Sequence, residues 1–91
     1  MSYKEDPGPE DVRRGVVIKT LRELRGMTRT ELGRAIGKSD KLIQAIETGY
    51  RRPTPEVISN IAATLDVPQI AITLPDYAQI RDPQPVGKTA A

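Results

Sequence analysis

The sequence predicts an all-α fold, a compact bundle of about five helices, from three observations. Apolar residues recur at helical spacing in successive short segments between residues 9 and 74. These segments open with Pro, Ser or Thr and most of them end at Gly, which is the pattern of capped helices. The 91 residues contain no Phe, no Trp and 3 Tyr, so the core must be aliphatic. We therefore expect one small domain over residues 9–74.

The first predicted helix begins at Pro9 and ends at Gly26. Proline suits the first position of a helix, and the two acidic residues that follow it suit the positive end of the helix dipole. The inward side of this helix is expected at Val12, Val16 or Val17, Ile18, Leu21 and Leu24. Gly15 weakens the middle of the segment, so a start at Gly15 is the alternative. Residues 1–8 are polar and are expected to form a loose N-terminal arm.

Two short helices joined by a glycine turn are predicted next. Thr28 and Glu31 form a capping box at the start of the first, in which each side chain satisfies the backbone amide of the other residue. Gly37 ends that helix, Ser39 caps the following one and Gly49 ends it. Their inward-facing residues are expected to be Leu32, Ala35 and Ile36 in the first helix and Leu42, Ile43 and Ile46 in the second.

A fourth helix is predicted to begin at Thr54, with Pro55 in its first position. Asp66 ends it, because Asp tolerates the left-handed backbone region better than most residues. The core residues of this helix are expected to be Ile58, Ile61, Ala62 and Leu65. Residues 68–74 allow two interpretations. Pro68 could start a short fifth helix, or the alternating Ile70, Ile72 and Leu74 could form a short C-terminal edge strand. Residues 75–91 are expected to form a Pro-containing C-terminal tail.

Charge is unevenly distributed along the chain, although the net charge is only +2. Residues 1–12 hold one basic and four acidic residues, and residues 54–91 hold two basic and four acidic residues. Residues 13–53 hold eleven Lys or Arg against four acidic residues, a net charge of +7. A basic segment between two acidic flanks indicates a surface that binds a polyanion, whereas the alternative is the solvated surface of an ordinary helical protein.

The composition also excludes several classes of function. With no His and no Cys, the chain lacks the usual acid–base group at neutral pH, a thiolate nucleophile and the commonest metal ligands. We therefore expect no enzyme activity, no metal, no cofactor and no small-molecule ligand. No apolar run approaches the roughly 18–20 residues of a membrane span. The acidic start lacks the features of a secretory signal, so we expect a cytoplasmic protein with no membrane partner.

The middle of the sequence resembles the helix-turn-helix family of phage Cro and cI-type repressors, which is called XRE-like. The matching residues are the run from Ile18 to Thr28, then Glu31, Leu32, Gly37, Ser39, Ile43, Ile46, Glu47, Gly49, Pro53, Leu65, Asp66 and Val67. The resemblance implies that the second and third of about five helices form a DNA-reading unit. Two departures lie in the second helix, where Gly33 replaces a common Ala and Arg29 a common Gln. Gly33 costs about 1 kcal/mol relative to Ala in a helix interior, which close approach of the neighbouring helix would offset.

The resemblance also implies which residues contact DNA. Residues at or beside the base-contacting positions of the family are Lys38, Asp40, Lys41, Gln44 and Ala45. Lys41 suits guanine, Gln44 suits adenine and Ala45 suits a thymine methyl, while Asp40 either accepts from cytosine or caps the helix. The expected contacts to the DNA backbone are Thr28, Arg29, Ser39, Tyr50, Arg51 and Arg52. The remaining basic residues are assigned to the general electrostatic field, and Glu47 is expected to pair with an arginine of the nearby basic loop.

We therefore expect a sequence-specific double-stranded DNA-binding transcriptional regulator, a repressor of phage, prophage or bacterial genes that acts by operator occupancy. It would bind a pseudo-palindromic operator as a homodimer, joined through Ile70, Ile72 and Leu74. One alternative is an antitoxin of a toxin–antitoxin pair with the same fold, which a co-purifying toxin would favour. Another is a protein-interaction module acting on host machinery, which salt-sensitive retention on DNA would oppose.

Overall fold

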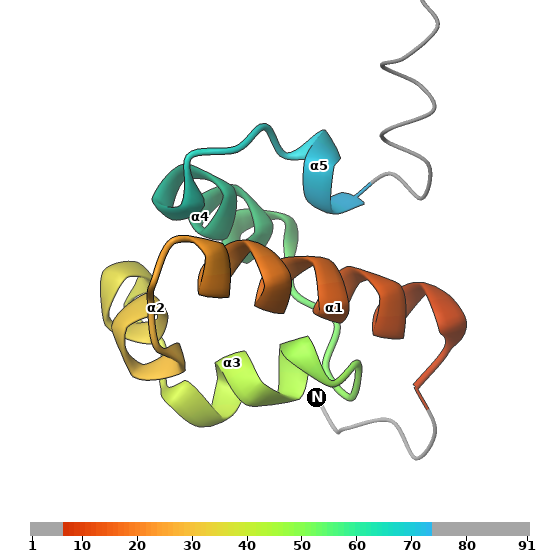
Figure 1. Cartoon of the computed structure of the whole chain (residues 1–91). Helices are drawn as coiled ribbons and strands as arrows, with labels where there is room; N and C mark the ends of the chain where they lie inside the picture. Colours follow the sequence, from red (N-terminus) through yellow and green to blue (C-terminus); the bar gives the residue numbers. More distant parts are fainter. Residues whose placement is uncertain (1–6, 74–91) are drawn as a thin grey trace, which may run out of the picture.

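The computed structural model describes residues 7–73, and these residues form a bundle of five helices (Figure 1). The helices are α1 (Pro9–Leu24), α2 (Arg29–Ile36), α3 (Asp40–Glu47), α4 (Pro55–Leu65) and α5 (Ile70–Thr73). In Figure 1, α1 crosses the middle of the molecule, with α3 below it and α4 and α5 above it. The predicted all-α bundle is confirmed. Residues 1–6 of the predicted arm and residues 74–91, with the predicted tail, lie outside the described residues.

The helices begin where the caps in the sequence predict. The Thr28 hydroxyl accepts from the Glu31 amide at 3.0 Å, and the Thr28 amide donates to Glu31 Oε1 at 2.8 Å, which completes the predicted capping box. Ser39 Oγ accepts from the Leu42 amide at 3.2 Å at the start of α3. The hydroxyl of Thr54 does the same for the first turn of α4. Each cap satisfies an amide that the helix itself leaves without a partner.

The ends of α2 and α4 are also as predicted. Gly37 closes α2 in the left-handed region with φ 73°, and Asp66 closes α4 there with φ 59°. The sequence left residues 68–74 open between a helix and a strand, and the structure shows a helix over residues 70–73. No strand is present within residues 7–73. The edge-strand alternative is therefore wrong for residues 70–73, and Leu74 lies outside the described residues.

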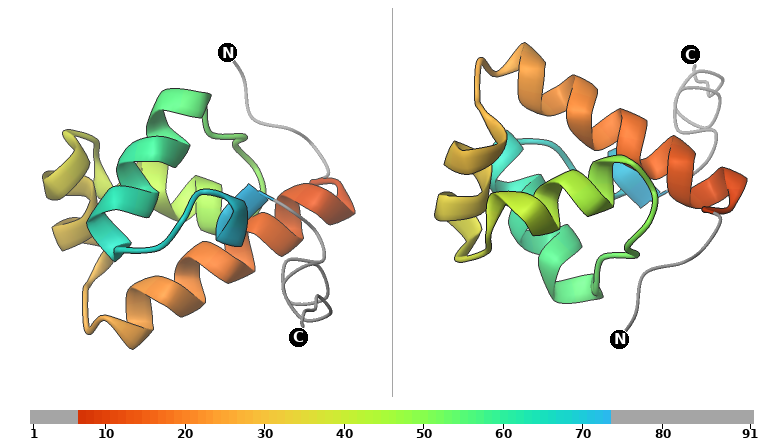
Figure 2. Two further views of the ribbon diagram at one scale, coloured as in Figure 1. Left: turned by 90° about the horizontal axis from the view of Figure 1, so that it is seen from above. Right: turned by 90° about the horizontal axis from the view of Figure 1, so that it is seen from below.

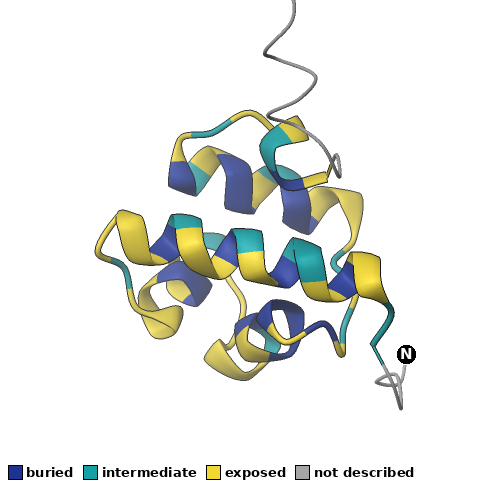
Figure 3. Ribbon diagram, turned by 45° about the vertical axis from the view of Figure 1, so that its right-hand side comes forward, coloured by how far each residue is buried: buried dark blue, intermediate teal, exposed yellow. Residues whose placement is uncertain are grey.

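A single aliphatic core lies between the helices, and Figure 3 shows the buried residues on their inner sides. Its members are Ile18, Leu32, Ile43, Ile46, Val57, Ile58, Ile61, Ala62, Leu65 and Ile72. The predicted residues of α4 all belong to it, while Leu21, Ile36 and Leu42 are partly buried against it. Ala35 was predicted to face inward, but it is exposed. Burial of this apolar surface is the main force that holds the bundle together.

The inward side of α1 differs from the prediction by about one residue. The buried positions are Asp11, Gly15, Ile18 and Arg22, which share one face of a helix because they are four, three and four residues apart. Val12 and Val16 are exposed, and Leu24 is 75% exposed. Of the predicted stripe, Ile18 is buried in the core, and Val17 and Leu21 are partly buried against it.

Close packing of α1 against α3 explains why the face of α1 that contains Gly15 is buried. A Cβ atom on Gly15 would collide with the backbone carbonyl groups of Ile46 and Glu47, at 2.6 Å from the Ile46 oxygen. Only a glycine lets the two backbones approach so closely. Because α1 begins at Pro9, the alternative start at Gly15 is wrong. Gly33 plays a similar part in α2, because a Cβ there would lie 2.6 Å from the Lys38 carbonyl oxygen in the turn that leads to α3.

Candidate nucleic-acid interface

Helix α3 lies on the outside of the bundle and leaves its N-terminal half open. Figure 2, right, looks at the molecule from below the view of Figure 1, and α3 crosses the near face. The predicted base-contacting residues Lys38, Asp40, Lys41 and Gln44 are all exposed. On the opposite side of α3, Ile43 and Ile46 are buried in the core. The core therefore holds α3 in place, and its polar side chains project from a fixed backbone.

Ala45 departs from the sequence-based interpretation, because it is only 7% exposed. It forms part of a shallow hollow on α3 that is also lined by Lys41, Gln44, Thr48 and Tyr50. The expectation that Ala45 faces outward is wrong. Thr48, to which the sequence reasoning assigned no contact, lines the same hollow, and its spacing from Lys41 along the helix was the available signal.

The loop after α3 is folded back on the end of the helix. The backbone amides of Tyr50 and Arg51 both donate to the carbonyl oxygen of Ala45, at 2.9 Å and 3.1 Å. Tyr50 is exposed and Arg51 is half-buried. These bonds fix the backbone from which the two predicted phosphate-contacting side chains leave. Ala45 thus holds this loop through its carbonyl group.

The other predicted backbone contacts lie at the starts of α2 and α3. Thr28, Arg29 and Ser39 are all exposed there. The hydroxyl oxygens of Thr28 and Ser39 each accept from a backbone amide of their own helix. A hydroxyl that accepts one hydrogen bond keeps its own hydrogen as a donor, so a phosphate contact remains compatible with the caps.

Arg52 is exposed but has an intramolecular partner. Its Nε and Nη2 groups donate to the two carboxylate oxygens of Asp11 at 3.1 Å and 3.4 Å. The hydrogen bond with Asp11 and the charge of Asp11 raise the pKa of Arg52 above its ordinary value, so the guanidinium stays charged. This pairing of the loop with the first turn of α1 was not predicted from the sequence.

A buried ion pair joins the end of α3 to α1. Arg22 donates through Nε to Glu47 Oε2 at 2.7 Å and through Nη2 to Glu47 Oε1 at 3.1 Å. Its Nη1 group donates to the Met27 carbonyl oxygen at 2.7 Å, so the same side chain also holds the turn before α2. The hydrogen bond to Glu47 raises the pKa of Arg22, although burial opposes the shift. Glu47 therefore pairs with α1, and the expectation that it pairs with the basic loop is wrong.

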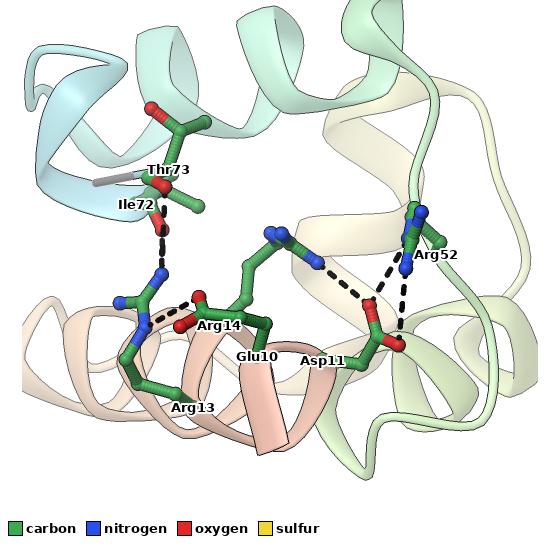
Figure 4. A network of polar contacts seen from close by, with 7 residues as sticks. All are labelled: Glu10, Asp11, Arg13, Arg14, Arg52, Ile72 and Thr73. Atoms are coloured by element: carbon green, nitrogen blue, oxygen red, sulfur yellow. Dashed lines mark hydrogen bonds and ion pairs between the residues drawn. The ribbon is translucent and has the colours of Figure 1, made fainter. Parts of the chain in front are cut away.

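Other arginines in and after α1 also bind within the protein. Arg13 donates to the carbonyl oxygens of Ile72 and Thr73 at 3.4 Å and 3.5 Å (Figure 4). Arg25 donates to the Leu65 carbonyl oxygen at 2.8 Å. A cation at a helix C-terminus satisfies carbonyl groups that the helix leaves open and interacts favourably with the dipole. These contacts give both arginines a structural role that the sequence did not predict.

The residues predicted to contact a second copy differ in their exposure. Ile72 is fully buried in the core of its own chain, so it is not free to contact a second copy and that prediction is wrong. Ile70 is 43% exposed on the other side of α5. Leu74 lies outside the described residues.

Over residues 7–73, no helix has the length and apolar character needed to cross a membrane. The same residues contain no group of three or more His, Cys, Asp or Glu side chains placed to hold a metal ion.

Comparison with known sequences identifies the motif. A family model described as helix-turn-helix matches residues 18–68. An HTH-type transcriptional regulator of Sinorhizobium medicae is 34% identical over 65 residues, which cover 71% of this chain and 47% of that protein. One from Rhizobium meliloti matches equally well. The chain thus spans about half the length of the curated relatives that it matches.

Comparison with solved structures agrees with this match. The restriction-modification controller protein C.AhdI from Aeromonas hydrophila superposes with a TM-score of 0.69 at 22% identity, over 71% of this chain and 98% of that chain. At this identity the likeness shows the fold alone. PlcR of Bacillus thuringiensis, solved in complex with the peptide PapR7 and DNA, gives a TM-score of 0.67 at 30% identity, over 75% of this chain and 25% of that chain.

Proposed function

This chain belongs to the helix-turn-helix family of Cro/cI (XRE-like) type, and on that premise we propose that it is a sequence-specific transcriptional regulator that binds double-stranded DNA. The observation that carries the proposal is the exposed N-terminal half of α3, held from behind by a buried core and the Arg22–Glu47 pair. A rigid helix that projects polar side chains fits the major groove. PlcR, a structural neighbour at 30% identity, was solved with DNA, which supports this assignment.

In this proposal, one set of residues recognises the DNA sequence and another set provides affinity for the DNA backbone. Lys41 and Gln44, with Lys38 and Asp40 beside them, contact base edges, and their exposure on α3 supports this role. The residues that contact the DNA backbone are Thr28, Arg29, Ser39, Tyr50, Arg51 and Arg52. Contacts of the second kind position the protein and carry no sequence information.

The regulator acts as a repressor of bacterial or phage genes by occupying an operator. Two copies bind a pseudo-palindrome, so that their α3 helices enter successive major grooves about 34–36 Å apart. Among the predicted dimer contacts within the described residues, the exposed Ile70 supports self-association, whereas Ile72 does not. A charged substitution, Ile70→Glu, should lower the dimer fraction measured by sedimentation, while Thr73→Glu on the same short helix serves as the control.

Selection of bound duplexes from a random pool tests the proposal as a whole. We expect enrichment of two inverted half-sites separated by about one helical turn. Enrichment of a single half-site would contradict the dimeric arrangement. Retention of all sequences alike would contradict sequence-specific regulation and leave only general DNA binding.

A further inference from the structure

Asp11 is a buried carboxylate in the first turn of α1, where the sequence predicts only a favourable charge at the positive end of the helix dipole. It is 3% exposed. Burial of a carboxylate is unfavourable unless cations and hydrogen-bond donors surround it. Asp11 meets this requirement with two arginines from different parts of the chain, Arg14 from α1 and Arg52 from the loop after α3 (Figure 4). One carboxylate between two guanidinium groups leaves the cluster positively charged.

The contact with Arg52 is made along one edge of the guanidinium. Asp11 accepts from Nε and Nη2, which leaves the Nη1 group outside this contact. The side chain of Arg52 remains 61% exposed although it is held at two points. An arginine fixed in this way keeps donors for a second anion, because its planar fork offers five N–H groups.

Arg52 also lies next to the surface that α3 presents. It lines one shallow hollow together with Lys38 and Arg51, on the side of the α3 start, and another together with Arg14 and Thr73. The Asp11 contact therefore links the first turn of α1 to the edge of the proposed DNA surface. The two residues are 41 positions apart in the sequence.

We propose that Asp11 is a positioning residue for DNA binding, which holds the guanidinium of Arg52 at the edge of the α3 surface so that it meets a DNA phosphate already ordered. This inference rests on the proposed function. An arginine side chain that is free in the unbound protein loses rotamer freedom when it binds, and this loss weakens binding. Asp11 removes part of that loss in advance, because two of the guanidinium N–H groups are already held.

Charge alone predicts the opposite effect of removing Asp11. Asp11→Asn deletes a negative charge near the DNA, so simple electrostatics predicts tighter binding. Positioning predicts weaker binding in spite of the favourable change in charge. The sign of the effect therefore separates the two mechanisms.

A double-mutant cycle tests the proposal with a fluorescently labelled duplex of mixed sequence, because phosphate contacts do not depend on sequence. The variants are Asp11→Asn, Arg52→Gln and both together, with affinities measured by anisotropy at low salt. We expect Asp11→Asn to weaken binding about three- to tenfold, the effect of losing one pre-ordered side chain. In the Arg52→Gln background the same change should have no weakening effect, because its target is gone.

Glu10→Gln is the matched control. Glu10 lies beside Asp11 in the same turn, carries the same charge and pairs with Arg13 rather than Arg52. We expect its removal to leave binding unchanged or slightly tighter. If Asp11→Asn behaves like Glu10→Gln, or weakens binding equally without Arg52, the positioning role is overturned while the proposed function stands. If the wild-type protein fails to bind the duplex, the proposed function falls, and the inference falls with it.

Far-UV circular dichroism establishes that each variant is folded at the temperature of the measurement. Should Asp11→Asn unfold, Arg52→Lys provides the test from the exposed side of the contact. Lysine keeps the charge but lacks the fork needed for a two-point contact with Asp11. We expect Arg52→Lys to weaken binding about three- to tenfold, and an affinity equal to that of the wild type would overturn the proposal.

Discussion

Helices α1 and α3 pack against each other at Gly15, yet they use their polar side chains in opposite ways. In and just after α1, four arginines donate to carboxylates or carbonyl groups of the same chain, namely Arg13, Arg14, Arg22 and Arg25. On α3 and at its start, Lys38, Lys41 and Gln44 are exposed and point away from the core. The net charge of the basic segment therefore overstates the number of cations that are available to DNA.

The positions of the two helices explain this difference. Helix α1 crosses the centre of the bundle, so its long side chains reach the ends of α3, α4 and α5 (Figures 1 and 4). Helix α3 packs against α1 and α2 with one side and leaves the other side open. Substitutions at the buried positions Gly15 and Arg22 of α1 should therefore change stability, whereas substitutions on the outer side of α3 should change DNA recognition.

The largest effect on stability is expected at Arg22. Arg22→Gln leaves Glu47 buried without its cation, and breaking a buried pair in this way costs about 3–5 kcal/mol of unfolding free energy. Urea denaturation measures the loss. Lys19→Gln removes an exposed cation from the same helix and should stay within about 0.5 kcal/mol of the wild type. Equal effects of the two changes would show that α1 does not use its cations internally.

Gly15→Ala tests the close contact between α1 and α3. The added methyl group meets backbone atoms of Ile46 and Glu47, which cannot turn aside as a side chain could. Overpacking of this kind costs about 1–3 kcal/mol, more than the helix propensity gained on replacing Gly by Ala. Thermal unfolding measures the change. Thr20→Ala, at an exposed position of α1, should leave the midpoint nearly unaltered, so a stabilised Gly15→Ala protein would refute the contact.

Lys41→Ala combined with Gln44→Ala tests whether the outer side of α3 recognises DNA. Each good contact to a base contributes about 1–3 kcal/mol of discrimination, so the selected site and a mismatched site should bind with closer affinities. Stability should change by less than about 0.5 kcal/mol, because both side chains are exposed. Competition binding with the two duplexes measures the ratio of the affinity for the selected site to the affinity for the mismatched site. Full specificity in this variant would mean that α3 is not the reading helix.

The smallest effect is expected at Arg25. Its side chain donates to the carbonyl oxygens of Leu65 and Asp66 at the end of α4, at 2.8 Å and 3.3 Å. Because the contact is partly open to water, Arg25→Gln should cost only about 0.5–1.5 kcal/mol. Hydrogen exchange in the last turn of α4 gives a local measure. No increase in exchange there would assign Arg25 to the general field, as the sequence suggested.

The local features of the fold were predictable because their partners lie within one turn of helix. The capping box of Thr28 and Glu31 and the cap at Ser39 each use a residue three positions away. The same holds for the exposed half of α3, since its polar residues and its buried isoleucines alternate at helical spacing. The starts of α2, α3 and α4 and the exposed side of α3 could therefore be predicted from the sequence alone.

The inward side of α1 could be predicted only in part. The apolar pattern correctly gave Ile18 and the partly buried Leu21. It also favoured Val12, Val16 and Leu24, but the structure leaves these exposed and buries Asp11 and Arg22 instead. A charged residue can be buried only when its partner is present, and those partners are Arg52 and Glu47, which lie 41 and 25 positions away. Ile72 was misassigned for a related reason, because burial on α5 depends on how that helix packs against α1.

A resemblance to a known family indicated which helix carries the candidate DNA contacts, and the sequence by itself determined where α2, α3 and α4 begin and which caps and glycines limit them. These features depend on short-range hydrogen bonds and backbone preferences that each segment carries within itself. Only the tertiary structure decided which face of α1 is buried and which arginines are held inside the protein. It alone brought Asp11 to Arg52. Such contacts exist only after segments far apart in the chain have packed together, because a charge is satisfied by its neighbours in space.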